Sequence, residues 1–251
     1  MPYIKRTVHA GNMIEIKKYY SARYGKKNNG IRAERQEVSS EKQKEINERN
    51  AVEKLTWLLN ANFGAGDYHV TLTYAESSKP EPEQAKENMR KFLRKLRAAY
   101  REHGSELKYV EVTEYENKRI HHHIVLPYID SRILSSLWKH GGVHFRAIYS
   151  DELSKLAEYL VKETGKTFRG SVVSVKRWNS SRNLKKPEIK KEIVPADSWR
   201  RVPAPMSGYY IPTDKIIVDV DAFGYPYQKY TMIKVSEKGR KKAKRQEQSL
   251  T

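Results

Sequence analysis

The sequence predicts an α+β fold, and two observations support this prediction. Segments rich in β-branched and aromatic residues, which favour strands, alternate with segments whose apolar residues recur at helical spacing. The segments follow one another in the order strand, helix, strand, strand, helix, strand, helix. The first six have the order of the split βαβ, or ferredoxin-like, fold, in which helices pack on an antiparallel sheet.

The strands are predicted over DYHVTLTYAE (67–76), KYVEVTEY (108–115), RIHHHIVLPY (119–128) and VHFRAIY (143–149). The clearest helix begins at the prolines 80 and 82 and ends at Gly104. One face of it carries basic residues that fit either a solvated face or a DNA groove: Lys86, Arg90, Arg94, Arg97 and Arg101. Asp130 is expected to cap a short helix that reaches Trp138, and Ser150 to cap another that ends at Gly165.

Composition divides the chain into four consecutive segments. Residues 1–64 read as a basic extension with one helix, over about 41–59, and 65–178 as the ferredoxin-like domain. Residues 179–236 read as a β-rich extension, and 237–251 as a basic tail.

The charge balance favours nucleic acid as the partner. Lys and Arg number 49 against 30 Asp and Glu, a formal net charge of +19 that polyanions would neutralise. No apolar run approaches the roughly 20 residues that span a bilayer, and no amino-terminal segment has the apolar core of a signal peptide, so no membrane partner is expected. The chain has no cysteine, which fits a cytoplasmic location and leaves histidine and carboxylates as the metal ligands.

Three adjacent histidines occupy the third predicted strand. Side chains alternate across a strand, so His121 and His123 share one face, while His122 joins Ile120 and Ile124 on the other. The His122 face is expected to be buried, which makes His122→Leu a tolerable change. His121 and His123 are then spaced to hold one ion on the more open face.

A two-histidine site for a hard divalent cation normally includes a carboxylate. A turn at Asn117–Lys118 would place Glu114 opposite His121 on the same face. That register also puts Val110 and Val112 on the open face, whereas a one-residue slip would bury both valines and present Glu111 instead. We prefer Glu114 and leave Glu111 as the alternative.

A tyrosine downstream of the histidines is the candidate nucleophile. The pattern Tyr-x-x-Lys occurs at Tyr24, Tyr115 and Tyr159, so the pattern alone carries little information. Tyr159 is the one on a predicted helix downstream of the histidines, and Lys162 shares its helix face at a spacing of three residues. Such a lysine could help to ionise the phenol or hold a phosphate.

These motifs together resemble a known family. EYENKRIHHHIVL, behind a VTLTY strand and ahead of a helix containing EYLVK, resembles the HUH-type single-strand DNA endonucleases, and among them the rolling-circle replication initiators of bacterial mobile elements and phages. The resemblance covers about residues 65–178. WNSSRNLKKP (178–187) is similar to a stretch that follows the nuclease core in such initiators. His122 departs from the pattern, because the middle position is usually apolar.

The resemblance implies an enzyme that nicks and rejoins single-stranded DNA at a replication origin and leaves a 5′-phosphotyrosine link. It implies metal ligation by His121, His123 and an upstream glutamate, with Mn²⁺ or Mg²⁺ as the ion. It implies Tyr159 as the nucleophile, with Lys162 assisting. The expected DNA contacts are Thr71, Thr73, Tyr74, Arg119, Trp178 and Arg182.

The resemblance also implies a bacterial cytoplasmic protein, encoded by a plasmid, phage or integrative element, that works with the host helicase and polymerase. Two alternatives stay open: a transposase or relaxase with the same chemistry, and a non-catalytic basic nucleic-acid-binding protein.

Overall fold

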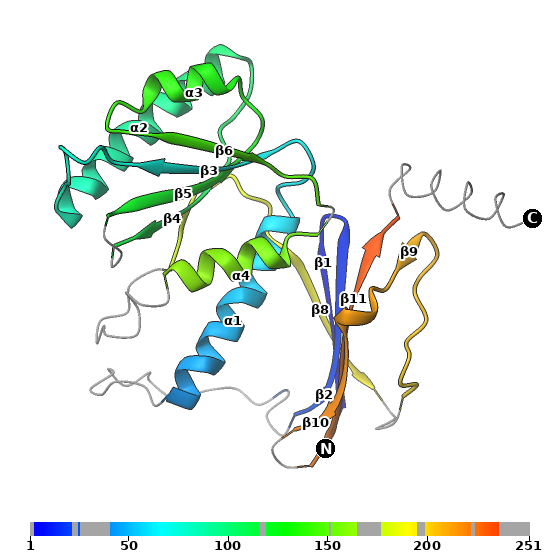
Figure 1. Ribbon diagram of the computed structural model, residues 1–251. Coiled ribbons are helices and arrows are strands. Elements are labelled where there is room, and N and C mark those ends of the chain that lie inside the picture. Colours follow the sequence, from blue (N-terminus) through cyan, green and yellow to red (C-terminus); the bar gives the residue numbers. More distant parts are fainter. Residues whose placement is uncertain are drawn as a thin grey trace, which may run out of the picture. The chain divides into compact units, whose positions relative to one another are not determined.

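The computed structural model describes residues 3–21, 25, 41–115, 119–150, 152–164, 177–194, 199–221 and 224–235 (Figure 1). The chain forms two compact units, one of residues 33–185 and the other of residues 1–32 with 186–251. This grouping differs from the four consecutive segments expected from the sequence. The predicted basic tail, 237–251, lies outside the described residues.

The unit of residues 33–185 contains a five-stranded antiparallel sheet. Its strands lie in the order β6 (Val143–Ala147), β3 (Tyr68–Thr73), β5 (His121–Leu126), β4 (Val110–Glu114) and β7 (Asn179–Ser180). Helix α2 (Pro82–Glu102) connects β3 to β4, and helix α3 (Ser131–Leu137) connects β5 to β6. This topology confirms the predicted ferredoxin-like order.

Helices cover both faces of this sheet (Figure 1). On the face of His122, here called the reverse face, α2 and α3 pack against Val70, Leu72, Ile124 and Leu126. On the face of His121 and His123, the ligand face, α1 (Glu41–Asn60) and α4 (Ser154–Glu163) pack against three buried valines, Val110, Val112 and Val125. The ligand face is therefore not the open surface that strand alternation alone suggested, because two helices cover part of it.

The helix boundaries follow local capping chemistry. Asp130 caps α3 as predicted, since its carboxylate accepts a hydrogen bond of 2.8 Å from the backbone N–H of Arg132. Gly104, with φ of 68°, follows the end of α2 in the left-handed conformation that glycine adopts without strain. The expected cap at Ser150 is wrong: α4 begins at Ser154, whose backbone N–H donates to the Glu152 carboxylate at 2.7 Å.

The other unit is a six-stranded antiparallel sheet that combines both ends of the chain. Five strands lie in the order β10 (Ile216–Val220), β11 (Pro226–Lys234), β2 (Met13–Tyr20), β1 (Tyr3–Ala10) and β8 (Glu188–Val194), and β9 (Tyr209–Tyr210) pairs with β11. A short 3₁₀ helix, Thr213–Lys215, precedes β10. The amino-terminal hairpin thus lies between carboxy-terminal strands. Among the described residues, no helix has both the length and the hydropathy that crossing a bilayer requires.

Candidate active site

The β4–β5 hairpin sets which carboxylate faces the histidines. The register pairs Glu114 with His121, Val112 with His123 and Val110 with Val125. Directly paired residues share a face, so Glu114 lies beside His121 and Glu111 lies on the reverse face. The valines that argued for a slipped register are buried beneath α1 and α4, which removes the conflict with the preferred one.

Four potential metal ligands converge on the ligand face. One ligand atom from each of Glu114, His121, His123 and Glu163 lies within 4.8 Å of all the others. His121 Nε2 is 2.8 Å from Glu114 Oε2. Glu163, on α4, was not predicted. It follows Tyr159 by four residues, and that helical spacing was the signal that placed it on the tyrosine's side of the helix.

Hydrogen bonds at Nδ1 orient both imidazoles and leave Nε2 of each ring outside these bonds. His121 Nδ1 lies 3.1 Å from the backbone oxygen of Arg119, to which it can donate. His123 Nδ1 lies 3.2 Å from both His69 Nε2 and Thr71 Oγ1. Partners of this kind fix the ring orientation and tautomer of metal-ligating histidines.

The donor set fits a divalent cation. His123 Nε2 is buried and has no hydrogen-bond partner among the described residues, although buried polar atoms are nearly always satisfied. A cation would provide the missing partner. Two imidazole nitrogens and two carboxylates suit a borderline or hard ion such as Mn²⁺.

Burial keeps two histidines of the ligand face, His69 and His123, neutral. It lowers the pKa of His123 to about 3, with further lowering by the charges of His69, His121 and His122. It lowers the pKa of His69 to about 4, with help from Arg146. A neutral imidazole is the form that binds a metal, so His123 is ready to act as a ligand at neutral pH.

Tyr159 lies beside the histidines. Its ring centroid is 5.3 Å from that of His123 and 5.8 Å from that of His69, and the residue is 41% exposed. Desolvation raises the pKa of Tyr159, as do the negative charges of Glu163 and Glu114, whereas the positive charge of Arg146 lowers it. The phenol is therefore protonated at neutral pH in the absence of a metal ion and substrate.

Two residues near Tyr159 were missed by the sequence reasoning. His69 and Arg146 are paired across β3 and β6, so both lie on the ligand face. His69 and Thr71 are two residues apart on one strand, so their side chains share a face, and this spacing could have identified His69. The predicted helper, Lys162, is exposed one turn beyond Tyr159, and the group of four potential ligands does not include it.

The six expected DNA contacts are separated by the structure. Thr71 contacts His123 on the ligand face, and the Thr73 hydroxyl donates to the Gly142 carbonyl at 3.3 Å. Arg119 pairs with Glu76 at 2.7 Å and is exposed. The expected DNA contact at Tyr74 is wrong, because Tyr74 is only 3% exposed and packs under the reverse face, where it cannot stack on a base. The two remaining residues, Trp178 and Arg182, lie near the β7 edge of the sheet and line hollows there.

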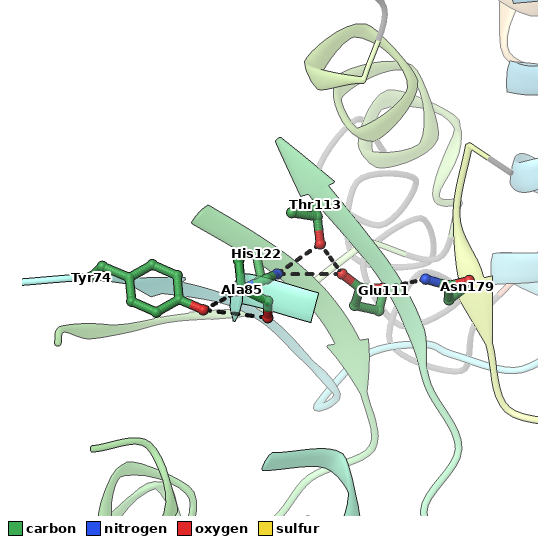
Figure 2. A network of polar contacts seen from close by, with 6 residues as sticks. All are labelled: Tyr74, Ala85, Glu111, Thr113, His122 and Asn179. Carbon is green, nitrogen blue, oxygen red and sulfur yellow. Dashed lines mark hydrogen bonds and ion pairs between the residues drawn. The ribbon is translucent and has the colours of Figure 1, made fainter. Parts of the chain in front are cut away.

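A polar network on the reverse face accommodates His122 (Figure 2). His122 is fully buried, with Nε2 3.0 Å from the Tyr74 hydroxyl and Nδ1 2.7 Å from Thr113 Oγ1. The Thr113 hydroxyl also bonds to Glu111, whose other carboxylate oxygen accepts from Asn179 Nδ2 at 2.9 Å. The unusual polar residue thus has partners on both ring nitrogens.

The same network determines the charge state of Glu111. Burial alone would raise the pKa of Glu111, but His122, Thr113 and Asn179 outweigh it, and the net pKa lies below the ordinary value. Glu111 is therefore an ionised structural residue of the reverse face, while Glu114 is the glutamate beside the histidines.

A protein-family model matches the part of the chain that contains this site. Residues 67–168 match the family model of replication-associated protein ORF2/G2P. The matched segment contains β3, β5 and α4, and with them the four potential ligands and Tyr159. Comparisons with curated proteins and with solved structures gave no match.

Proposed function

We propose that this protein initiates rolling-circle replication as an HUH-type endonuclease, which nicks and rejoins single-stranded DNA through Tyr159. The observation that carries the proposal is the position of the Tyr159 ring against His123, beside four converging metal ligands. The replication-associated family match over the same residues supports a role at a replication origin.

The residues that would hold the ion are His121, His123, Glu114 and Glu163. When bound, Mn²⁺ or Mg²⁺ would polarise the non-bridging oxygens of the scissile phosphate. The ligands are preorganised, because His69, Thr71 and the Arg119 carbonyl already orient both imidazoles.

The proposed step is a transesterification. The Tyr159 oxygen attacks phosphorus as the phenol loses its proton, the bond between phosphorus and the 3′ oxygen breaks, and that oxygen is protonated. The products are a 5′-phosphotyrosine link and a free 3′ hydroxyl, which a host polymerase could extend beside a host helicase. One phosphate ester replaces another, so the reverse reaction can rejoin the strand.

Positive charge near Tyr159 would favour the phenolate in this step. Arg146 already lowers the pKa of Tyr159, so Arg146→Gln is expected to slow nicking. Lys162→Gln is expected to slow it without abolishing it, because Lys162 is exposed and would act on the incoming phosphate. Single-turnover nicking rates measured for both variants test these roles, and unchanged rates for both would remove them from the mechanism.

The test of the proposed function uses single-stranded oligonucleotides labelled at the 5′ or the 3′ end, with Mn²⁺. A protein-linked band that carries the downstream label is expected for the wild type and not for Tyr159→Phe. Tyr149→Phe, which alters an exposed tyrosine outside the ligand group, is the matched control and should react normally. Cleavage by Tyr159→Phe at the wild-type rate would indicate metal-dependent hydrolysis. DNA binding without cleavage by the wild type would indicate a non-catalytic binding protein.

A further inference from the structure

A large cavity lies at the edge of the same sheet, on the side of β7. It is open to solvent, has a volume of about 790 Å³ and lies between α1, α2, β4 and the segment 177–180. This volume is within the range of about 300–1,000 Å³ typical of ligand sites. The potential metal ligands and Tyr159 are not among its lining residues, so it is a separate feature of the unit.

The lining has the three chemical features that an unpaired nucleotide requires. Aromatic rings are contributed by Tyr109, Tyr115 and Trp178. Amides from Asn50 and Asn179, together with the buried Glu111 carboxylate, offer donors and acceptors. Positive charge comes from Lys54, Lys86, Arg90 and Arg177. Stacking surfaces combined with cationic side chains are the recurrent features of single-strand binding sites.

A second hollow extends the first. It encloses about 480 Å³ and shares Tyr109 and Ser180 with the larger cavity, so the two adjoin. Its basic lining residues are Arg97, Arg101 and Arg182. Among the described residues, the two hollows together are lined by seven basic residues and by two acidic ones, Glu106 and Glu111. Such a groove fits an extended polyanion better than a small neutral molecule.

The basic residues of α2 are available to a ligand. Lys86 pairs with Glu83 at 2.6 Å and Arg90 with Glu87 at 2.8 Å, but these pairs are between neighbours on an exposed helix surface. Pairs of this kind contribute little stability, so a phosphate can replace the carboxylate partner. The structure thereby favours the DNA groove over the solvated face for four of the five basic residues noted in the sequence; Arg94 does not line the hollows.

We infer that this edge groove, defined by the two hollows, binds a segment of single-stranded DNA away from the nick, with one base stacked on Trp178. The inference rests on the proposed function for the identity of the polymer. The groove would hold the strand while the ligand face acts on the scissile phosphate. The network of Figure 2 begins at the groove, since Asn179 and Glu111 bond through Thr113 to His122, which lies on β5 between the two histidines of the ligand face.

The test compares two double variants with equal loss of charge. Lys54→Gln/Arg90→Gln removes groove charges, and Lys42→Gln/Arg94→Gln removes exposed charges from the same two helices outside the groove. Binding of a fluorescein-labelled mixed-sequence 20-mer is followed by anisotropy in EDTA, so that no cutting occurs. The groove pair should weaken binding at least tenfold and lower the slope of log affinity against log salt by about 1.4, or about 0.7 for each phosphate contact. The control pair should change affinity less than threefold.

Stacking is tested on the same probe. Trp178→Ala should weaken binding roughly 5- to 150-fold, and Trp178→Phe should restore most of the affinity, since phenylalanine keeps an aromatic face. Because Trp178 also packs against the core, circular dichroism of both variants must match the wild type. Equal losses for the groove pair and the control pair would overturn the inference even if Trp178→Ala weakens binding.

The two proposals fail separately. If Tyr159-dependent nicking occurs while the groove pair binds like the control pair, the endonuclease function stands and the groove inference is wrong. If the groove pair binds weakly but no tyrosine adduct forms with Mn²⁺, the groove stands and the endonuclease function is wrong.

Discussion

Replacing His122 by leucine tests the reverse-face network. Strand alternation alone suggested that this change would be tolerated, because His122 lies among apolar residues. The structure instead gives both ring nitrogens a partner, the buried Tyr74 on one side and the half-buried Thr113 with the buried Glu111 on the other. Leucine fills similar space but leaves these groups short of a hydrogen bond.

The expected loss of stability follows from the partners that His122 would no longer contact. The change removes two hydrogen bonds, worth about 0.5–1.5 kcal/mol each. Glu111, which stays buried, also loses a partner 3.5 Å away, and this adds about 1–3 kcal/mol. His122→Leu should therefore lower the free energy of unfolding by about 2–5 kcal/mol. Urea unfolding followed by circular dichroism at pH 7 measures this, together with amide hydrogen exchange in the β4 and β5 peptides.

The matched control is His144→Leu, which makes the same chemical change at an exposed position of β6. We expect it to alter the free energy of unfolding by less than about 0.5 kcal/mol. If His122→Leu were equally harmless, the network would be worth little, and the original expectation would be restored.

Three further predictions concern the metal, acid stability and DNA affinity. Glu163→Ala should weaken Mn²⁺ binding at least about tenfold by calorimetry, whereas Glu158→Ala, an exposed change on the same helix, should not. The pKa of Glu111 is lowered in the folded state, so its contribution is present above its ordinary pKa and is lost as pH falls through the folded value. Glu111→Gln should accordingly lower stability at pH 7 and flatten the decline below about pH 4.5 in acid unfolding curves. Deleting residues 238–251, which begin with six basic residues in eight, should flatten the salt dependence of DNA binding without moving the cut site, and a moved site would make the tail a specificity element.

Local patterns predicted most of the ferredoxin-like unit. The order of its strands and helices, the Asp130 cap, the end of α2 and the pairing of Glu114 with His121 all depend on short-range signals. Period-two alternation separates the two sides of a strand, and turn length sets the hairpin register. These signals do not report which helix covers each side. The valines at 110 and 112 therefore looked misplaced until α1 and α4 were seen over them.

These local signals could not predict which strands pair when they lie far apart in the chain. Strand β1 pairs with β8, so that Lys5 lies opposite Glu192, 187 residues further along the chain, and nothing local in TVHA or EIKKEIV identifies the partner. The prediction from composition therefore assigned the two ends of the chain to different segments, although they form one sheet. Glu163 and Arg146 were missed for a related reason, because they reach the site from elements whose packing had to be known first.

In the proposed reaction, Tyr159 forms the covalent link to DNA. Its most direct test is mass spectrometry of the trapped adduct, after a single-stranded origin fragment reacts with the wild-type protein and Mn²⁺ and the complex is digested with trypsin and nuclease. We predict a nucleotide joined through its 5′ phosphate to the peptide containing Tyr159. A nucleotide on the peptide of Tyr24 or Tyr115, the other two Tyr-x-x-Lys positions, or cleaved DNA without any adduct, would contradict the claim.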